Sequence, residues 1–278
     1  MGQQYLRSAI LRLENSTFQV LILENLRVSF EIVKDESSTV NKAKIQVFNL
    51  NQNSRTFLED EELKVQLEVG YETTIGESSN EILFIGNLGK KGKGRTWSER
   101  MGQEWVTNIE CGDGEKQVAE TNAQVSFDKG VPFTAIISQV AQSFGLPIGN
   151  VQPVGEGIAL NGFSADGKAA KILDKLAKRF NFNWSIQNNA VQITREGIPT
   201  PEVGVVLTPQ TGLVGNVTKR EEGIQCKALL NPQISPGRLL TIAGSAQVTA
   251  GVYKVTKATY RGDTFGAAWN TEIEAIAL

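Results

Sequence analysis

One strand-like pattern occurs twice in this chain, at 105–110 (WVTNIE) and at 269–274 (WNTEIE), and a small residue follows each copy. Alternate residues of a strand point to opposite faces. Each copy therefore places its tryptophan, threonine and isoleucine on one face and its glutamate on the other: Trp105, Thr107, Ile109 and Glu110, then Trp269, Thr271, Ile273 and Glu274. Chance could repeat so short a pattern, so the surrounding sequence has to decide.

Similar strands precede both copies in the same order. An apolar strand that ends in glycine comes first (LEVGY at 67–71, LTIAG at 240–244), and a second strand follows (LFIGNL at 83–88, VYKVTKATY at 252–260). A loop and the repeated hexapeptide complete each series. This matching order favours two related β-modules over coincidence.

Apolar residues alternate with polar residues in the strands of the first module. The stretch 25–32 has Leu26, Val28, Phe30 and Ile32 on one face, and the stretch 62–71 has Leu63, Val65, Leu67, Val69 and Tyr71. Such alternation is typical of antiparallel sheets and barrels with one face on a core. We expect the barrel interiors to be filled by apolar side chains. The stretch 42–50 predicts a further strand, and 51–62 predicts a short capped helical turn.

The middle of the chain has a different character. Apolar residues recur at helical spacing in 130–147, after Pro132, and in 165–180, and two short strands at 182–187 and 190–196 are joined by Asn-Asn. The predicted fold is therefore mainly β with an α/β insert: two related antiparallel β-barrels flank a small α/β domain. We expect a first barrel domain with a basic hairpin arm at 1–127, the insert and a linker at 128–200, and a second barrel domain at 201–278.

Composition argues against most enzyme classes. The 278 residues carry a formal charge of -2 and no histidine, which removes Ser-His and Cys-His pairs, histidine bases and histidine-containing zinc sites. Cys111 and Cys226 lack a metal-ligand spacing and read as small buried residues. We predict no enzyme activity, catalytic residue, metal or cofactor. No apolar run is long enough for a membrane helix, and a signal-peptide core is missing, so no stable membrane insertion is expected.

A glycine-rich basic stretch, GKKGKGRT at 89–96, is close to a phosphate-binding loop but has arginine in place of the lysine, and a strand pattern rather than a helix follows. The alternative to a phosphate-binding loop is a solvent-exposed hairpin tip whose positive charges orient a neighbouring protein during assembly. The candidate contact residues are Lys90, Lys91, Lys93 and Arg95. The RGD sequence at 261–263 is interpreted as turn chemistry.

The motif order resembles a known family. The stretches 229–244 (LLNPQISPGRLLTIAG) and 251–276 are similar to the end of the baseplate hub proteins of tailed phages, the late control protein D family, which is related to type VI secretion spike hub domains. The stretches 45–58, 63–71 and 83–88 resemble the first half of that family, and 133–147 resembles the helix that opens its intervening domain.

The resemblance implies a structural virion protein. In such hubs, two tube-like barrels per chain and three chains per ring make a pseudo-sixfold annulus, which joins a sixfold tail tube or distal tail protein to a threefold central spike or fibre. Phage DNA and the tape-measure protein pass through it. The expected location is the tail baseplate of the virion, after assembly in the host cytoplasm. The repeated hexapeptide would then mark equivalent strands of the two barrels in a homotrimer.

Two alternatives remain open. A tube-initiator or distal tail protein would form a sixfold ring and needs only one barrel per chain. A glycan- or peptidoglycan-binding module of a tail would use an exposed aromatic side chain, and Trp184 in FNWSIQ is the candidate sugar platform.

Overall fold

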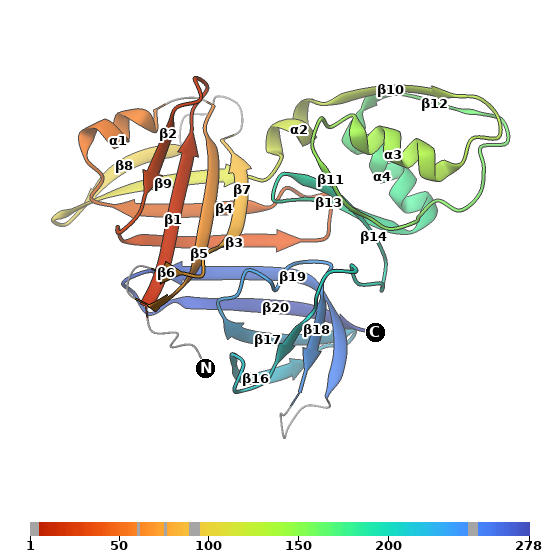
Figure 1. The fold of residues 1–278 in the computed structure, drawn as a ribbon. Helices are drawn as coiled ribbons and strands as arrows, with labels where there is room; N and C mark the ends of the chain where they lie inside the picture. Colours follow the sequence, from red (N-terminus) through yellow and green to blue (C-terminus); the bar gives the residue numbers. More distant parts are fainter. Residues whose placement is uncertain (1–5, 60–61, 75–76, 89–94, 244–249) are drawn as a thin grey trace.

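The computed structural model describes residues 6–59, 62–74, 77–88, 95–243 and 250–278. Eight antiparallel strands form one continuous sheet, which runs from top to bottom of the β-rich part in Figure 1. In spatial order they are β8 (Thr96–Met101), β9 (Glu104–Gly112), β4 (Lys42–Phe48), β3 (Val28–Asp35), β19 (Gly251–Asp263), β20 (Trp269–Ala277), β17 (Gly223–Leu229) and β16 (Leu213–Lys219). Strands from both ends of the sequence thus meet at the β3–β19 pair.

Other strands cross this sheet and cover one of its faces (Figure 1). In the first half these are β1 (Leu6–Glu14), β2 (Val20–Leu23), β5 (Lys64–Thr74) and β7 (Glu81–Asn87), with the short β6 (Glu77–Ser78) on β5. In the second half they are β15 (Val205–Leu207) and β18 (Leu239–Ile242). Helix α1 (Gln52–Phe57) follows β4, and the Asn51 side chain accepts a hydrogen bond from the Ser54 N–H at its start. A single apolar core lies between the layers and includes residues of both halves.

The two halves use the same order of paired strands. The first half reads β3-β4-β9-β7-β5-β1, and the second reads β16-β17-β20-β19-β18-β15. They differ at the last pair, since β1 and β5 are antiparallel whereas β15 and β18 are parallel. They differ also in the contact of β7 with β9, which is a single residue pair. Among the described residues, β3 does not pair with β1, and β16 does not pair with β15. Each series of strands is therefore open and does not close into a barrel by hydrogen bonding.

The residue registers of the two halves also match. Thr107 lies opposite Val47 in the first half, and Thr271 lies opposite Ala228 in the second. Two residues further on, Ile109 faces Ile45 and Ile273 faces Cys226. In both halves, the backbone N–H of the first residue after the paired strand donates to the carbonyl of the motif tryptophan. After β4, Asn49 donates to Trp105 at 2.7 Å, and after β17, Leu230 donates to Trp269 at 3.3 Å.

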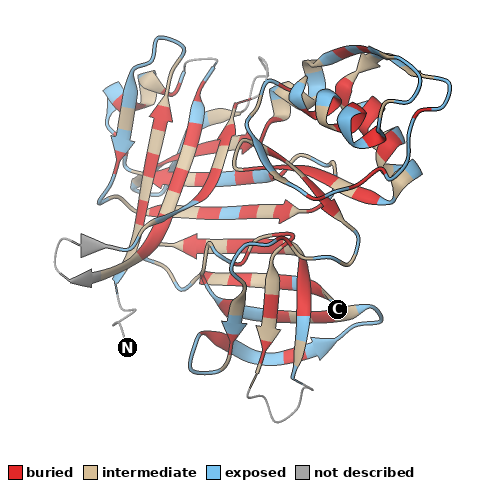
Figure 2. Ribbon diagram, turned by 45° about the vertical axis from the view of Figure 1, so that its right-hand side comes forward, coloured by how far each residue is buried: buried red, intermediate tan, exposed pale blue. Residues whose placement is uncertain are grey.

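The predicted alternation is confirmed in the first half. Buried and exposed positions alternate along the strands in Figure 2, because one face lies on the core and the other meets solvent. Val28, Phe30 and Ile32 of β3 are buried, as are Val65, Leu67 and Val69 of β5. Cys111 and Cys226 are free and buried, as expected.

The inserted part has an apolar core of its own, which includes buried residues between Ala123 and Ile193. Its elements are α2 (Glu115–Glu120), β10 (Asn122–Phe127), α3 (Phe133–Gln142), β11 (Ile148–Val151), β12 (Phe163–Lys168), α4 (Ala169–Phe180), β13 (Phe182–Gln187) and β14 (Ala190–Arg195). The helices predicted in 130–147 and 165–180 are confirmed as α3 and α4, which pack together over the β10–β12 pair (Figure 1). The second helix begins at Ala169 rather than at residue 165, because residues 165–168 belong to strand β12. This core begins upstream of residue 128, because β10 pairs with β12.

The Asn-Asn turn also forms as predicted. Asn188 and Asn189 have φ of 51° and 63° and join β13 to β14, which pair in antiparallel register. Asparagine tolerates this left-handed conformation better than most residues, which is why the pair suits a two-residue hairpin. The turn points back to the large sheet, where it becomes part of a junction described below.

Candidate assembly surfaces

The uncovered face of the eight-strand sheet, here called the outer face, carries a ladder of opposite charges. Arg261 Nη1 lies 2.7 Å from Glu272 Oε2, and Arg261 Nε lies 3.2 Å from Glu31 Oε2 across the β3–β19 pair. Lys257 Nζ lies 3.3 Å from Glu274 Oε1. Hydrogen bonding to Glu272 is the largest cause of the raised pKa of Arg261. Because these pairs are partly exposed, each adds little stability, and the ladder mainly neutralises the face.

The repeated glutamates both lie on this face. Glu110 Oε1 is 3.8 Å from Lys44 Nζ on β4, and Glu274 pairs with Lys257 on β19. A shallow hollow of about 440 Å³ opens on the same face where the halves meet, and its lining includes Glu31, Lys44 and Trp97. The sheet thus presents one mixed-charge surface built from both halves.

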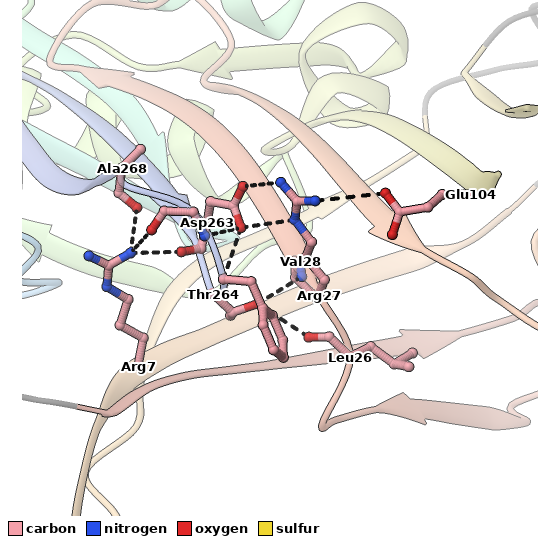
Figure 3. Close-up of polar contacts among 10 residues, drawn as sticks. Arg7, Leu26, Arg27, Val28, Glu104, Asp263, Thr264 and Ala268 are labelled. Atoms are coloured by element: carbon pink, nitrogen blue, oxygen red, sulfur yellow. Dashed lines mark hydrogen bonds and ion pairs between the residues drawn. The ribbon is translucent and has the colours of Figure 1, made fainter. Parts of the chain in front are cut away.

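The joint between the halves is fixed at the β19–β20 turn (Figure 3). Arg27 donates to Asp263 through Nη2 at 3.0 Å and Nε at 3.3 Å, while Asp263 Oδ1 accepts the N–H groups of Phe265 and Gly266. Partial burial acts to raise the pKa of Asp263, but the hydrogen bonds from Arg27 and the two N–H groups outweigh it and lower that pKa. Asp263 belongs to the RGD sequence, so this aspartate organises a turn, as interpreted from the sequence.

A second arginine holds the same turn from the crossing layer. The Arg7 guanidinium donates to the carbonyls of Asp263 at 3.0 Å and of Gly266, and it lies over the Trp269 ring at 5.6 Å. Thr264 accepts a hydrogen bond from the Val28 N–H at 3.0 Å (Figure 3). Strand β1 and the start of strand β3 are thereby bound to the β19–β20 turn.

Buried polar groups attach the insert to the large sheet. Asp113 accepts the N–H groups of Asn188 and Asn189 at the tip of the β13–β14 hairpin. Lys34 Nζ donates to Asn188 Oδ1 at 2.6 Å, and Asn41 Nδ2 donates to the Ile186 carbonyl at 2.8 Å. We call these groups the hairpin junction. Every one of them has a hydrogen-bond partner, which is the condition under which buried polar groups stabilise a structure.

Burial shifts the titration of this junction. Desolvation raises the pKa of Asp113 to about 7, against the charge of Lys34 and the two backbone hydrogen bonds. Desolvation also lowers the pKa of Lys34 to about 8. Nearby, Lys254 Nζ lies 2.8 Å from Glu36 Oε1, and desolvation raises the pKa of Glu36. Charged groups buried in pairs need good geometry, and here they lie between two separately packed cores.

The two motif tryptophans differ sharply in their surroundings. Trp269 is 4% exposed and makes edge contacts with the rings of Phe30 at 5.7 Å and Tyr71 at 6.3 Å. Trp105 is 42% exposed and has the Arg55 guanidinium over its ring at 4.6 Å. The motif threonines and isoleucines, by contrast, are buried in both strands: Thr107, Ile109, Thr271 and Ile273.

The predicted basic arm is described only at its end. Lys90, Lys91 and Lys93 lie outside the described residues. Arg95 Nη2 lies 2.5 Å from Glu115 Oε1 at the start of α2 and is partly buried. Arg95 is therefore held by the insert rather than presented on a free hairpin tip.

Other candidate sites find little support in the described part of the chain. Trp184 is 2% exposed, stacks on Phe144 at 5.4 Å and donates from Nε1 to Asp174, so the proposal that it is a sugar platform is wrong. No group of three or more Cys, Asp or Glu residues among those described could hold a metal ion. Within the same residues, no helix has the length and apolar character needed to cross a membrane.

No protein-family model and no curated protein sequence matches this chain. Solved structures do match over nearly the whole length. A 43 kDa tail protein of prophage MuSo2 from Shewanella oneidensis is similar with a TM-score of 0.62 and 10% identity, covering 97% of each chain. A tail protein from Neisseria meningitidis MC58 gives 0.63 and 8%, covering 96% of each.

The chain has the fold of a phage tail protein. A third similar structure, with a TM-score of 0.56 and 12% identity over 96% of this chain and 76% of the other, is an Escherichia coli component of the type VI secretion system described as similar to tail proteins of bacteriophage T4. The resemblance inferred from the motif order is thus confirmed for the fold. At these identities the likeness concerns the fold alone.

Proposed function

We propose that the protein is a structural component of a phage tail that forms the baseplate hub. Three copies make a pseudo-sixfold ring, in which the two halves of each chain act as two tube-like barrel modules. The ring joins the tail tube or a distal tail protein to the central spike or fibre, and its opening passes DNA and the tape-measure protein. The proposal includes the virion as location, assembly in the host cytoplasm and a non-enzymatic role.

The observation that carries this proposal is the repeated strand order within one chain. The series β3-β4-β9-β7-β5-β1 and β16-β17-β20-β19-β18-β15 have matching registers at the Trp-x-Thr-x-Ile-Glu strands. A threefold ring presents six similar modules only if each chain supplies two, which a junction between sixfold and threefold parts requires. The separate core of the insert supports its division from the two modules, which share the other core.

The mass of the purified protein in solution tests the proposal. Light scattering across a concentration series should give three times the chain mass of 30.3 kDa, and electron micrographs should show rings with six similar lobes. A hexamer would instead support a tube-initiator or distal tail protein. A protein that remains monomeric, both alone and with its tail tube, would overturn the hub proposal.

A further inference from the structure

The joint inside the chain supplies a template for a joint between chains. Strand β3, the edge of the first module, pairs with the C-terminal part of β19 in the second module, with Ser29 opposite Asp263 and Glu31 opposite Arg261. The internal repeat contains a counterpart of each of these two strands.

Register identifies the counterpart of β3. Val28 of β3 lies opposite Val47 of β4, and Leu213 of β16 lies opposite Ala228, the residue of β17 that corresponds to Val47. Strand β16 is therefore the second module's equivalent of β3. A bulge between Val214 and Thr218 lengthens it locally.

Register also identifies the counterpart of the C-terminal part of β19. Strand β8 runs beside the first Trp-x-Thr-x-Ile-Glu strand with Ser98 opposite Thr107, and β19 runs beside the second with Tyr260 opposite Thr271. Strand β8 therefore occupies in the first module the place that residues 258–263 of β19 occupy in the second.

Both counterparts have a free edge. In the part of the chain that the structure describes, β8 pairs only with β9 and β16 only with β17. They are the two ends of the eight-strand sheet, at opposite sides of the β-rich part in Figure 1. Apolar side chains lie exposed on them: Met101 is 57% exposed and Val214 is 39% exposed. An unpaired edge of this kind is a template for pairing with another chain.

We propose that β16 of one copy pairs antiparallel with β8 of the next copy, so that the joint between subunits repeats the β3–β19 joint within each subunit. This inference rests on the proposed ring. When the register of the β3–β19 pair is applied to β16 and β8, Val214 lies opposite Met101 and Thr218 lies opposite Glu99. Arg220, the residue that follows β16, then lies opposite Trp97. Each contact is heterologous, as a closed ring requires, and the eight-strand sheets join into one continuous sheet.

The side chains on the two edges are complementary. On the outer face, Arg220, which donates to Gln225 within its own chain, lies opposite the Trp97 ring and diagonal to the Glu99 carboxylate. The Glu99–Thr218 pair takes the place of the internal Arg261–Glu31 pair. On the inner face, the internal joint sets the large Phe30 opposite Gly262. The transferred pair is the smaller Val217 opposite the longer Arg100.

The exposure of Trp105 has the same explanation. Its counterpart Trp269 is buried in part by Phe30 of β3, across the internal joint. Trp105 lies beside β8, where the position of β3 is filled only when the β16 strand of another copy arrives. In the proposed joint, Val217 of a neighbouring copy takes the place of Phe30 and Arg100 that of Gly262, so the neighbouring strand and the Arg100 side chain together cover this side of Trp105.

Engineered disulfides test this pairing directly. In the double variant Met101→Cys/Val214→Cys the two thiols lie at opposite ends of the sheet of one chain, so any disulfide must join two chains. Mild oxidation should give covalent dimers and trimers, with the trimer as the end point because the ring closes. The control Arg100→Cys/Val214→Cys places the cysteines on opposite faces and should remain uncrosslinked. Cys111 and Cys226 are buried and do not compete.

A charge exchange gives an independent readout. Arg220→Glu and Glu99→Lys should each weaken self-association by about tenfold, and the double variant should recover it. Lys171→Glu on α4 is the matched control away from the joint. A stable trimer that shows no crosslink in the Met101→Cys/Val214→Cys variant and no response to these charges would overturn this inference but not the hub. A protein that is neither crosslinked nor associated, alone or with its tail tube, would overturn both.

Discussion

At the scale of single residues, two tryptophans of one motif have unequal consequences. Trp269 packs between Phe30 and Tyr71 at the joint, so Trp269→Ala should lower the free energy of unfolding by about 3–5 kcal/mol. Trp105 is partly solvent-exposed in the isolated chain, and Trp105→Ala should cost about 1–2 kcal/mol. Urea unfolding of the two variants measures the difference. Equal losses would contradict this assignment of burial.

The buried pair at the hairpin junction predicts an unusual pH dependence. The raised pKa of Asp113 means that its contribution to stability is fully present below its ordinary value of 3.8 and is lost as pH rises towards about 7. The lowered pKa of Lys34 acts in the opposite sense: its contribution is present above 10.5 and is lost as pH falls through about 8. These two groups should therefore leave the junction least stable between pH 7 and 8.

Urea unfolding at several pH values measures this dependence. In Asp113→Asn the free energy of unfolding should no longer fall between about pH 4 and 7, because the titrating carboxyl is gone. In Lys34→Met it should no longer rise between about pH 8 and 10, because the titrating amine is gone. The difference between wild type and variant isolates each group from the other carboxylates and amines. A fall that persists unchanged in Asp113→Asn would assign the effect to other groups.

At the scale of elements, the β19–β20 turn binds the two halves together. Asp263 accepts two backbone N–H groups and the Arg27 guanidinium, so Asp263→Ala leaves these donors without their partner. The expected loss is about 1–3 kcal/mol in the free energy of unfolding. The control is Glu272→Ala, which removes an exposed ion pair of the outer face and should cost about 0–1 kcal/mol. A similar cost for both would argue against a special role of the turn.

Local signals predicted the elements that depend on neighbouring residues. Helix α3 begins after Pro132 and α4 follows its apolar spacing, while Asn188 and Asn189 form the expected turn. By contrast, β12 (Phe163–Lys168) has only a short alternation, Phe163 and Ala165 against Ser164 and Asp166, and its pairing with β10 is fixed by contacts distant in sequence. Strand β1 buries Ala9, Leu11 and Leu13 on one face, a period-two pattern that is visible in the sequence.

The candidate surfaces were less predictable than the strands. The repeated hexapeptides indicated which strands correspond, but the exposure of Trp105 and the burial of Trp269 depend on whether an edge has a partner strand. Edge status is set by the whole sheet, so a local pattern does not contain it. Arg95 is a similar case: the basic spacing suggested an exposed arm, whereas its partner Glu115 is set by the position of the insert.

At the scale of the whole molecule, the eight-strand sheet ends in β8 and β16, each with one partner strand among the described residues, and the insert is bound to one side (Figure 1). In the proposed ring these edges make the contacts between copies, and the basic stretch is left for a different contact. We expect Lys90, Lys91 and Lys93 to contact an acidic neighbour in the ring or the tail tube, because clustered charge steers and registers association.

The triple variant Lys90→Glu/Lys91→Glu/Lys93→Glu tests that contact. Association with the ring or tube should weaken and lose much of its salt dependence, while the melting temperature should stay that of the wild type. Arg95→Glu should behave differently, since it also breaks the ion pair with Glu115 and should lower stability by about 1 kcal/mol. Sedimentation velocity at two salt concentrations, with thermal melting alongside, separates the two effects. A triple variant that melts and assembles as the wild type would remove the basic stretch from the assembly contacts and leave the strand edges as the principal ones.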